Sequence, residues 1–394
     1  MNSSFQSPQS PLKRVVLTST MLQRNGYSFI QTMLKHSGGR PKKKMYHRVH
    51  DLDKVMDLQK KPSLILQLKN IIQSHKTHSI LIRDLEKEVG FVNKWNFMAL
   101  IEKYPSIFRA DGGNGVPIKV RLTEKALRVA AEEVVARELM EPILVTNLRK
   151  LLMMSMECRI PIHKIELIES ELGLPRDFKK CLIPKYPQFF SVKDFNGHDY
   201  LYLESWDSSL AISSREEDLN FIARSVSEGD QKKTAKISRD GSCSSPFAFK
   251  MSFPDGFRPN KGYLEEVHRW QKMAFPSPYL NARRFDFADP KARKRAVAVL
   301  HEVLSLTMEK RLNSAQLDAF HDEYQLPCKL LLCLVKNHGI FYITNKGARS
   351  TVFLKEAYDG LNLIEKCPLL RFQDKFVGIG INRDVRNDSE RVIS

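Results

Sequence analysis

A lysine followed five positions later by phenylalanine occurs at three points of the chain, and this internal repeat restricts the fold more than any other feature. The three copies span 103–108, 185–190 and 336–341. Each copy follows a Gly or Pro signal at which one helix ends and the next begins. Self-similarity of this kind indicates tandem structural units, so the sequence predicts three copies of one unit.

The elements expected within each unit are three helices followed by a β-hairpin. The first two helices are expected at 62–75 and 80–89, 142–156 and 161–172, and 290–312 and 314–324, and the third ends near the repeated lysine. Two β-rich runs follow around an Asn-Gly or Gly-containing turn, at 106–110 and 118–122, 189–193 and 200–203, and 340–344 and 351–354. This order of elements is that of a winged helix. The predicted fold is therefore mainly α with small β-hairpins (α+β), in three winged-helix-like units.

The boundaries of these units follow from composition. The first unit is expected at 45–137, the second at 138–212 and the third at 247–372. Residues 213–246 are polar with few large apolar side chains, which predicts a flexible linker. Residues 373–394 show little periodicity, so we expect a frayed C-terminal tail.

Positive charge is concentrated at the start of the chain. The net charge is +18, from 63 Lys and Arg against 45 Asp and Glu, and residues 1–50 carry nine of the bases and no acid. This segment is also rich in serine, contains arginines and has amphipathic helical spacing, which are features of an organelle transit peptide. We expect that peptide within 1–44. The alternatives are a basic arm that binds nucleic acid and a nuclear import signal at 40–44.

The sequence lacks the local signatures of common enzyme sites. It has no Gly-x-x-x-x-Gly-Lys phosphate loop, no Gly-x-Ser-x-Gly elbow and no His-Glu-x-x-His motif. Its six cysteines include no Cys-x-x-Cys pair, which disfavours a zinc finger. The densest apolar run, 330–335, is too short to cross a membrane. We therefore expect no catalytic residues, metal, cofactor or membrane association.

Basic side chains at the ends of elements are the candidates for phosphate contacts. The main cluster lies in the first turns of the helix expected from 290, where the helix dipole disfavours cations: Lys291, Arg293, Lys294 and Arg295. A solvated helix end, capped by Asp286 and Asp289, is the alternative. The other basic candidates form pairs: Lys60 and Lys61, Lys179 and Lys180, Arg283 and Arg284, and Lys310 and Arg311.

Aromatic side chains near the repeated lysines indicate a second kind of contact. Tyr104 and Tyr186 are expected to stack on unpaired bases. Phe108, Phe190 and Phe341 occupy equivalent positions beside a helix end, so they are expected in the core.

Longer motifs extend from about Arg48 to Arg371. They include Gly-Leu-Pro-Arg-Asp-Phe at 173–178, Lys-Tyr-Pro at 185–187, Ser-Pro-Tyr at 277–279, His-Glu-Val-Leu-Ser-Leu-Thr-Met-Glu-Lys-Arg at 301–311 and Thr-Val-Phe-Leu-Lys-Glu-Ala-Tyr at 351–358. In these motifs the chain resembles the plant organelle RNA recognition (PORR) domain proteins. It departs from them at Asn337-His338-Gly339, where the family more often has a His-Pro-Gly-type turn.

This resemblance implies a nuclear-encoded plant protein imported into mitochondria or, alternatively, chloroplasts. It also implies binding of single-stranded or irregular intron RNA and promotion of group II intron splicing, with other splicing factors as candidate partners. In such introns the RNA performs the transesterification, so a protein need only hold it folded.

Two functions from other classes compete with this interpretation. One is a nuclear DNA-binding protein that uses winged helices, but its reader helix at 327–336 is almost wholly apolar, unlike a helix that enters a major groove. The other is a basic, non-enzymatic scaffold that binds a protein partner.

Overall fold

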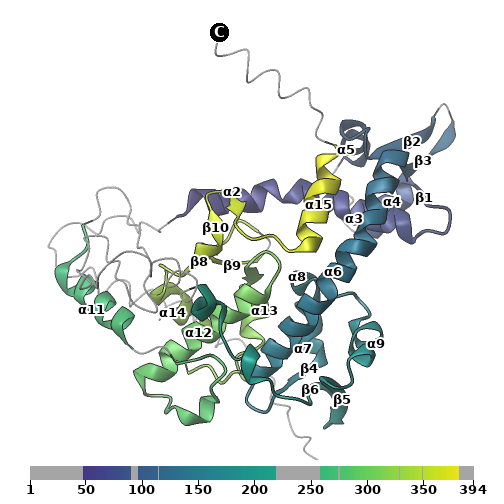
Figure 1. Cartoon of the computed structure of the whole chain (residues 1–394). Helices are drawn as coiled ribbons and strands as arrows, with labels where there is room; N and C mark the ends of the chain where they lie inside the picture. The colour runs from purple at the N-terminus through teal and green to yellow at the C-terminus, as the bar shows by residue number, and fades with distance from the viewer. Residues whose placement is uncertain are drawn as a thin grey trace, which may run out of the picture. The chain divides into compact units, whose positions relative to one another are not determined.

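The computed structural model describes residues 48–89, 96–113, 115–218, 258–273, 276–327, 329–347 and 349–380. These residues belong to one unit that begins at Arg48. They combine helices with small antiparallel sheets (Figure 1), so the predicted α+β class is confirmed. The expected transit peptide, residues 219–246 of the expected linker and residues 381–394 of the expected tail lie outside the described residues.

The first unit places a small sheet among short helices. Its elements are α2 (His50–Leu58), α3 (Lys60–Ser74), β1 (Ser79–Leu81), α4 (Ile82–Val89), α5 (Phe97–Lys103), β2 (Phe108–Gly113) and β3 (Val116–Leu122). The Asn96 side chain caps α5 by accepting a hydrogen bond from the Ala99 N–H. Tyr104 ends this helix because the residue before a proline avoids helical backbone angles.

The expected second and third units also combine helices with a small sheet, although their helices differ in number and length from those of the first. The second contains α6 (Glu124–Met154), β4 (Arg159–Pro161), α7 (Ile162–Glu166), α8 (Glu169–Leu172), α9 (Phe178–Cys181), η1 (Ile183–Lys185), β5 (Phe190–Phe195), β6 (His198–Leu203) and η2 (Ser208–Leu210). The third contains α11 (Lys261–Lys272), η3 (Ala282–Arg284), α12 (Pro290–Leu306), β7 (Arg311–Asn313), α13 (Ser314–Asp318), α14 (Leu330–Lys336), β8 (Phe341–Thr344), β9 (Thr351–Leu354), η4 (Lys355–Ala357), β10 (Tyr358–Asp359), β11 (Asn362–Leu363) and α15 (Pro368–Gly378).

Each unit contains an antiparallel sheet with the same strand order. Sheet 1 is β1–β3–β2, sheet 2 is β4–β6–β5 and sheet 3 is β7–β9–β8. The hairpins lie where the sequence predicts them. The short first strand of each sheet is an addition to that prediction, because three residues are too few to show a pattern.

A tight turn with a left-handed residue precedes the first strand of each sheet. His78, Cys158 and Lys310 have φ angles of 47°, 50° and 52°, and each donates its N–H to the carbonyl three residues earlier. In the third unit this turn ends α12 well before the expected residue 312. The reason is that Thr307 is extended and its hydroxyl donates to the carbonyl of Leu304.

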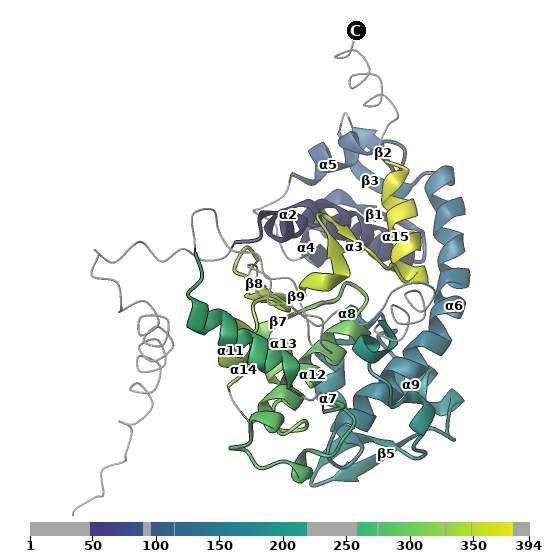
Figure 2. The same ribbon diagram turned by 60° about the vertical axis from the view of Figure 1, so that its left-hand side comes forward.

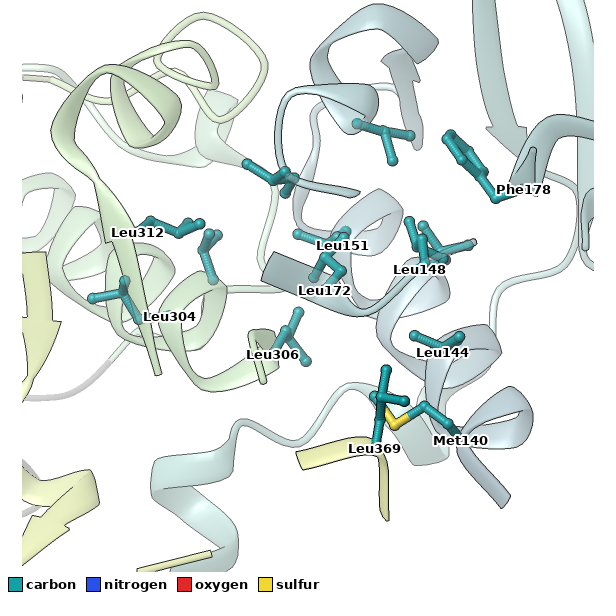
Figure 3. Close-up of a cluster of buried hydrophobic side chains, with 14 of the residues drawn as sticks. Met140, Leu144, Leu148, Leu151, Leu172, Phe178, Leu304, Leu306, Leu312 and Leu369 are labelled. Atoms are coloured by element: carbon teal, nitrogen blue, oxygen red, sulfur yellow. The ribbon is translucent and has the colours of Figure 1, made fainter. Parts of the chain in front are cut away.

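Helix α6 continues through 137, where the boundary between the first two units is expected. Thr123 caps its start by accepting from the Ala126 N–H. Pro142, expected to start a helix, lies at an exposed position inside α6, between the buried Met140 and Leu144. None of the described helices, α6 included, is long and apolar enough to span a bilayer. Figure 3 shows the buried side chains that α6 contributes to the core, among them Met140, Leu144, Leu148 and Leu151.

The C-terminal helix α15 packs against α6 and α3 (Figure 2). Its buried Leu369, Phe372 and Phe376 recur at helical spacing. The buried ammonium of Lys69, on α3, pairs with Glu133 of α6 and lies 5.2 Å and 5.7 Å from the centroids of the two phenylalanine rings. This packing corrects the expected start of the tail, because residues 373–378 are helical.

Buried polar contacts join the second unit to the third. The carboxylate of Glu302, on α12, accepts hydrogen bonds from the Tyr279 hydroxyl at 2.7 Å and from the Ser214 N–H at 2.8 Å. The Lys150 ammonium, on α6, lies 3.5 Å from the same carboxylate. The expected flexible linker therefore begins with residues that contact the third unit.

Candidate nucleic-acid interface

The predicted phosphate-binding cluster at the start of α12 divides into a buried pair and an exposed pair. Lys294 and Arg295 are only 0% and 3% exposed, whereas Lys291 and Arg293 are exposed. The prediction of phosphate contact is therefore wrong for Lys294 and Arg295. It stays a prediction for Lys291 and Arg293.

The two buried cations hold backbone carbonyls instead of phosphates. The Arg295 guanidinium donates to the carbonyls of Leu280 at 2.7 Å and Tyr324 at 3.1 Å, and also to those of Pro278 and Met154. Burial lowers the pKa of Arg295 to about 10, so it remains charged at neutral pH. The Lys294 ammonium donates to the carbonyl of Trp270, in the last turn of α11, and to that of Met273, which follows α11.

Lys310 and Arg311 are also engaged within the fold. Lys310 is half-buried and its ammonium donates to the Ser305 carbonyl, and burial lowers its pKa. Arg311 pairs with Glu309, and its guanidinium lies 5.4 Å from the centroid of the Phe353 ring. Neither cation is a free phosphate ligand in this arrangement.

The two predicted stacking tyrosines are half-buried. Tyr186 stacks on Phe189 with ring centroids 6.3 Å apart, and its hydroxyl donates to Glu141; this hydrogen bond raises the pKa of Tyr186. Tyr104 packs against the hydrophobic core. Phe108, Phe190 and Phe341 are buried, as predicted from their shared positions.

The remaining predicted cations are exposed, and two of them lie beside sheet 2. The exposed residues are Lys60, Lys61, Lys179, Lys180, Arg283 and Arg284. Lys60 pairs with Asp57. Lys179 pairs with Asp199 of β6, and Arg283 lies 3.4 Å from Glu157, which also pairs with Arg159 of β4.

The three sheets present chemically different outer faces, meaning the faces opposite their buried residues. Side chains alternate between the faces of a strand, so each outer face can be read from the strand registers. On sheet 1 this face carries three exposed cations, Arg109, Lys119 and Arg121. Asp111 contacts two of them, at 3.0 Å from Arg109 and 2.6 Å from Arg121.

On sheet 2 the outer face consists of aromatic rings interleaved with cations. The guanidinium of Arg159 lies 4.3, 5.1 and 5.7 Å from the ring centroids of Phe195, Tyr200 and Tyr202. It also donates to the Tyr202 hydroxyl at 2.9 Å, a hydrogen bond that raises the pKa of Arg159. The Lys193 ammonium lies 5.0 Å from the centroid of Tyr202. Phe195 is 43% exposed, so solvent reaches this group of rings.

On sheet 3 the outer face is covered by α2. Phe353 is 0% exposed and belongs to a small core with Leu52 and Val55 of α2. Asp53 of α2 accepts hydrogen bonds from Thr344 at 2.5 Å and from the hydroxyl of Tyr342, the neighbour of Phe353 in the sheet. Among the three three-stranded sheets, only the outer faces of sheets 1 and 2 therefore remain open.

The family model of the plant organelle RNA recognition domain matches residues 47–382. The chain belongs to the PORR family. The match covers all of the described residues and includes the three three-stranded sheets. No solved structure matches this PORR chain.

Curated relatives of this PORR protein come from plants. It is 32% identical over 327 residues to a rice protein, "Protein WHAT'S THIS FACTOR 1 homolog, chloroplastic", covering 82% of this chain and 62% of the relative. It is 32% identical over 340 residues to the Arabidopsis thaliana "Protein ROOT PRIMORDIUM DEFECTIVE 1", covering 82% and 80%. It is 26% identical over 335 residues to the Arabidopsis thaliana "Protein WHAT'S THIS FACTOR 9, mitochondrial", covering 83% and 81%. The chain thus spans 62% of the length of the rice relative.

The outer face of sheet 2 is the part of this PORR protein that sequence reasoning missed. One signal was present: Tyr200 and Tyr202 alternate with the buried Leu201, which is the pattern of a strand with an aromatic outer face. The positions of Arg159 and Phe195 in the same group depend on strand pairing, which this pattern does not give.

Proposed function

We propose that this PORR protein binds organellar intron RNA and promotes group II intron splicing without catalysing the chemistry. Family membership supports an RNA-related role, and the names of relatives place two of them in chloroplasts and mitochondria. The single observation that carries the proposal is the open, cationic outer face of sheet 1. Its Arg109, Lys119 and Arg121 project away from the core, where phosphates have access to them.

We also propose that the three units are winged-helix-like but do not read a major groove. The helix in the reader position of the third unit, α14, buries Leu330, Cys333 and Leu334 in the core. Residues 330–335 of this helix also carry no polar group that could hydrogen-bond to base edges, unlike a helix that reads a major groove. The outer faces of sheets 1 and 2, and not the third helices, are then the RNA-binding elements, which favours irregular or single-stranded RNA over duplex DNA.

A salt series of filter-binding measurements tests the role of sheet 1. If each of Arg109, Lys119 and Arg121 meets one phosphate, changing all three to Gln lowers the slope of log affinity against log salt by about 2, at about 0.7 per single-strand contact. The matched control changes Lys261, Arg269 and Lys272 of α11 to Gln, which removes the same charge from another surface. Equal slopes for both variants would show a non-specific charge effect.

Two measurements in the plant test the biological part of the proposal. RNA co-immunoprecipitation from purified organelles should recover intron sequences, and loss of the protein should leave specific group II introns unspliced. If the expected transit peptide is removed, mass spectrometry of the organellar protein should detect no peptides from residues 1–35. Recovery of nuclear DNA with the full-length chain would instead support the DNA-binding alternative.

A further inference from the structure

We propose that the outer face of sheet 2 is a stacking platform for unpaired RNA bases. The platform consists of Arg159, Lys193, Phe195, Tyr200 and Tyr202. The inference rests on the proposed RNA binding and adds to it a site with a different chemistry, since sheet 1 offers charge alone. It also replaces the stacking role that the sequence assigned to Tyr104 and Tyr186.

The three rings are spaced along the sheet and accessible to solvent, which base stacking requires and packing of the core does not. Tyr200 and Tyr202 are two residues apart on one strand, with ring centroids separated by 6.5 Å. Phe195 stands edge-on to Tyr200 at 5.8 Å. All three rings keep solvent-accessible surface. Aromatic rings spaced along a strand offer successive bases a stacking surface that tolerates any sequence.

The cations of the platform point to a polyanionic ligand. Arg159 lies among the three rings and Lys193 lies against Tyr202. Each also pairs with a carboxylate, Arg159 with Glu157 and Lys193 with Glu204, so an RNA phosphate would have to compete with these two acids. Two further cations lie near the edge of the platform. Arg283 is 3.4 Å from Glu157, and Lys179 pairs with Asp199. A backbone that follows these cations would bring its bases over the rings.

Sheet 3 shows what the same face looks like when a protein segment occupies it. Strand registers make Phe353 the equivalent of Tyr202, and Thr344 the equivalent of Lys193. There, α2 brings the carboxylate of Asp53 to hydroxyl donors, including that of Thr344, and Phe353 becomes inaccessible. Sheet 2 has the Lys193 ammonium, paired with Glu204, at the equivalent position, and its rings keep solvent-accessible surface. We therefore assign its occupant as nucleic acid and make a helical protein partner an outcome of the test.

The test compares two variants of the full chain that differ only in whether the rings remain. In the first, Phe195, Tyr200 and Tyr202 are changed to Leu, which keeps apolar bulk but removes stacking. In the second, Tyr200→Phe and Tyr202→Phe keep the rings and lose the hydroxyls, so both variants lose the hydrogen bond from Arg159 to Tyr202. Circular dichroism melting confirms that both variants are folded.

The expected result is a selective loss in the Leu variant. Its affinity for unstructured oligoadenylate and oligouridylate should fall about tenfold or more, as expected for at least one lost stack, with an unchanged salt slope. Wild type and the Phe variant should quench a 2-aminopurine base in the oligonucleotide, and the Leu variant should not.

The other outcomes separate the failure of this inference from the failure of the proposed function. If the wild type binds no RNA, the proposed function fails and the platform fails with it. If the wild type binds RNA and the Leu variant binds equally well, only the platform is overturned. If that Leu variant also loses splicing in the plant, the face belongs to a protein partner.

Discussion

Arg159 and Arg311 occupy equivalent positions in sheets 2 and 3, each as the first residue of a short strand opposite an aromatic residue. Arg159 is paired in register with Tyr202 and Arg311 with Phe353, at 5.7 Å and 5.4 Å from the ring centroids. In sheet 1 the same pair of positions holds Ser79 and Arg121. One backbone framework thus carries three surfaces: a basic face, an open aromatic face and a face covered by α2.

Arg295 should be among the most important side chains for stability. Arg295→Met leaves several buried carbonyls without their donor, which should lower the free energy of unfolding by about 3 kcal/mol. Arg293→Met, at an exposed position two residues earlier, should change it by less than about 0.5 kcal/mol. Urea denaturation measures both values. Equal effects of the two changes would mean that Arg295 does not hold the carbonyls seen here.

The buried pair of Lys69 and Glu133 should link α3, α6 and α15. Glu133→Gln leaves the Lys69 ammonium buried without its counter-charge and should destabilise the protein by about 3 kcal/mol. The double variant Lys69→Met, Glu133→Leu should recover most of this loss, because well-packed apolar residues replace buried ion pairs at little cost. A double variant no more stable than Glu133→Gln would show that the pair's geometry, and not its charge, matters.

The same pair predicts a pH dependence with a definite sign. Burial raises the pKa of Glu133, but the hydrogen bond and charge of Lys69, together with Arg137, outweigh burial and lower it below 4.5. A lowered pKa in the folded state gives stability that is present above the unfolded pKa and lost as pH falls through the folded one. The free energy of unfolding should therefore decrease below about pH 4.5, and Glu133→Gln should make this decrease smaller. Chemical denaturation at a series of pH values measures it.

Sequence reasoning succeeded where the signal was local. The hairpins and the buried Phe108, Phe190 and Phe341 follow from short patterns that each unit repeats. It failed for Lys294 and Arg295 because the helix-end argument considers only the dipole of their own helix. Their partners are carbonyls from other elements, which tertiary packing brings together.

The predicted start of the C-terminal tail was wrong for a similar physical reason. Residues 373–378 are too few to show a convincing helical period by themselves. They are helical because Phe376 completes an apolar stripe that α6 and α3 cover. The platform on sheet 2 was missed because its members come from three strands, and only the pairing of those strands makes them neighbours.

Truncation of a buried leucine of α12 should lower stability much more than truncation of an exposed leucine of α6. Leu304 of α12 is fully buried and Leu139 of α6 is 58% exposed. Leu304→Ala should cost about 2 to 5 kcal/mol, because it removes buried methyl groups and leaves a cavity. Leu139→Ala should cost less than about 0.5 kcal/mol. Thermal and urea unfolding of both variants gives the comparison, and a large loss for Leu139→Ala would indicate that its surface is covered in the protein.

Docking of α2 on sheet 3 should depend on Asp53. Asp53→Ala removes the acceptor for the buried hydroxyls of Tyr342 and Thr344, which lie 2.8 Å and 2.5 Å from its carboxylate. A buried hydroxyl without a partner costs about 1 to 3 kcal/mol, so α2 should detach before the rest of the protein unfolds. Amide hydrogen exchange should then speed up in His50–Leu58 and at Phe353, and remain slow in sheets 1 and 2.

Asp57→Ala is the control on the same helix, because the ion pairs of Asp57 with Lys60 and Lys346 are exposed. Faster exchange in both variants, or in neither, would mean that the outer face of sheet 3 is not held closed by this carboxylate.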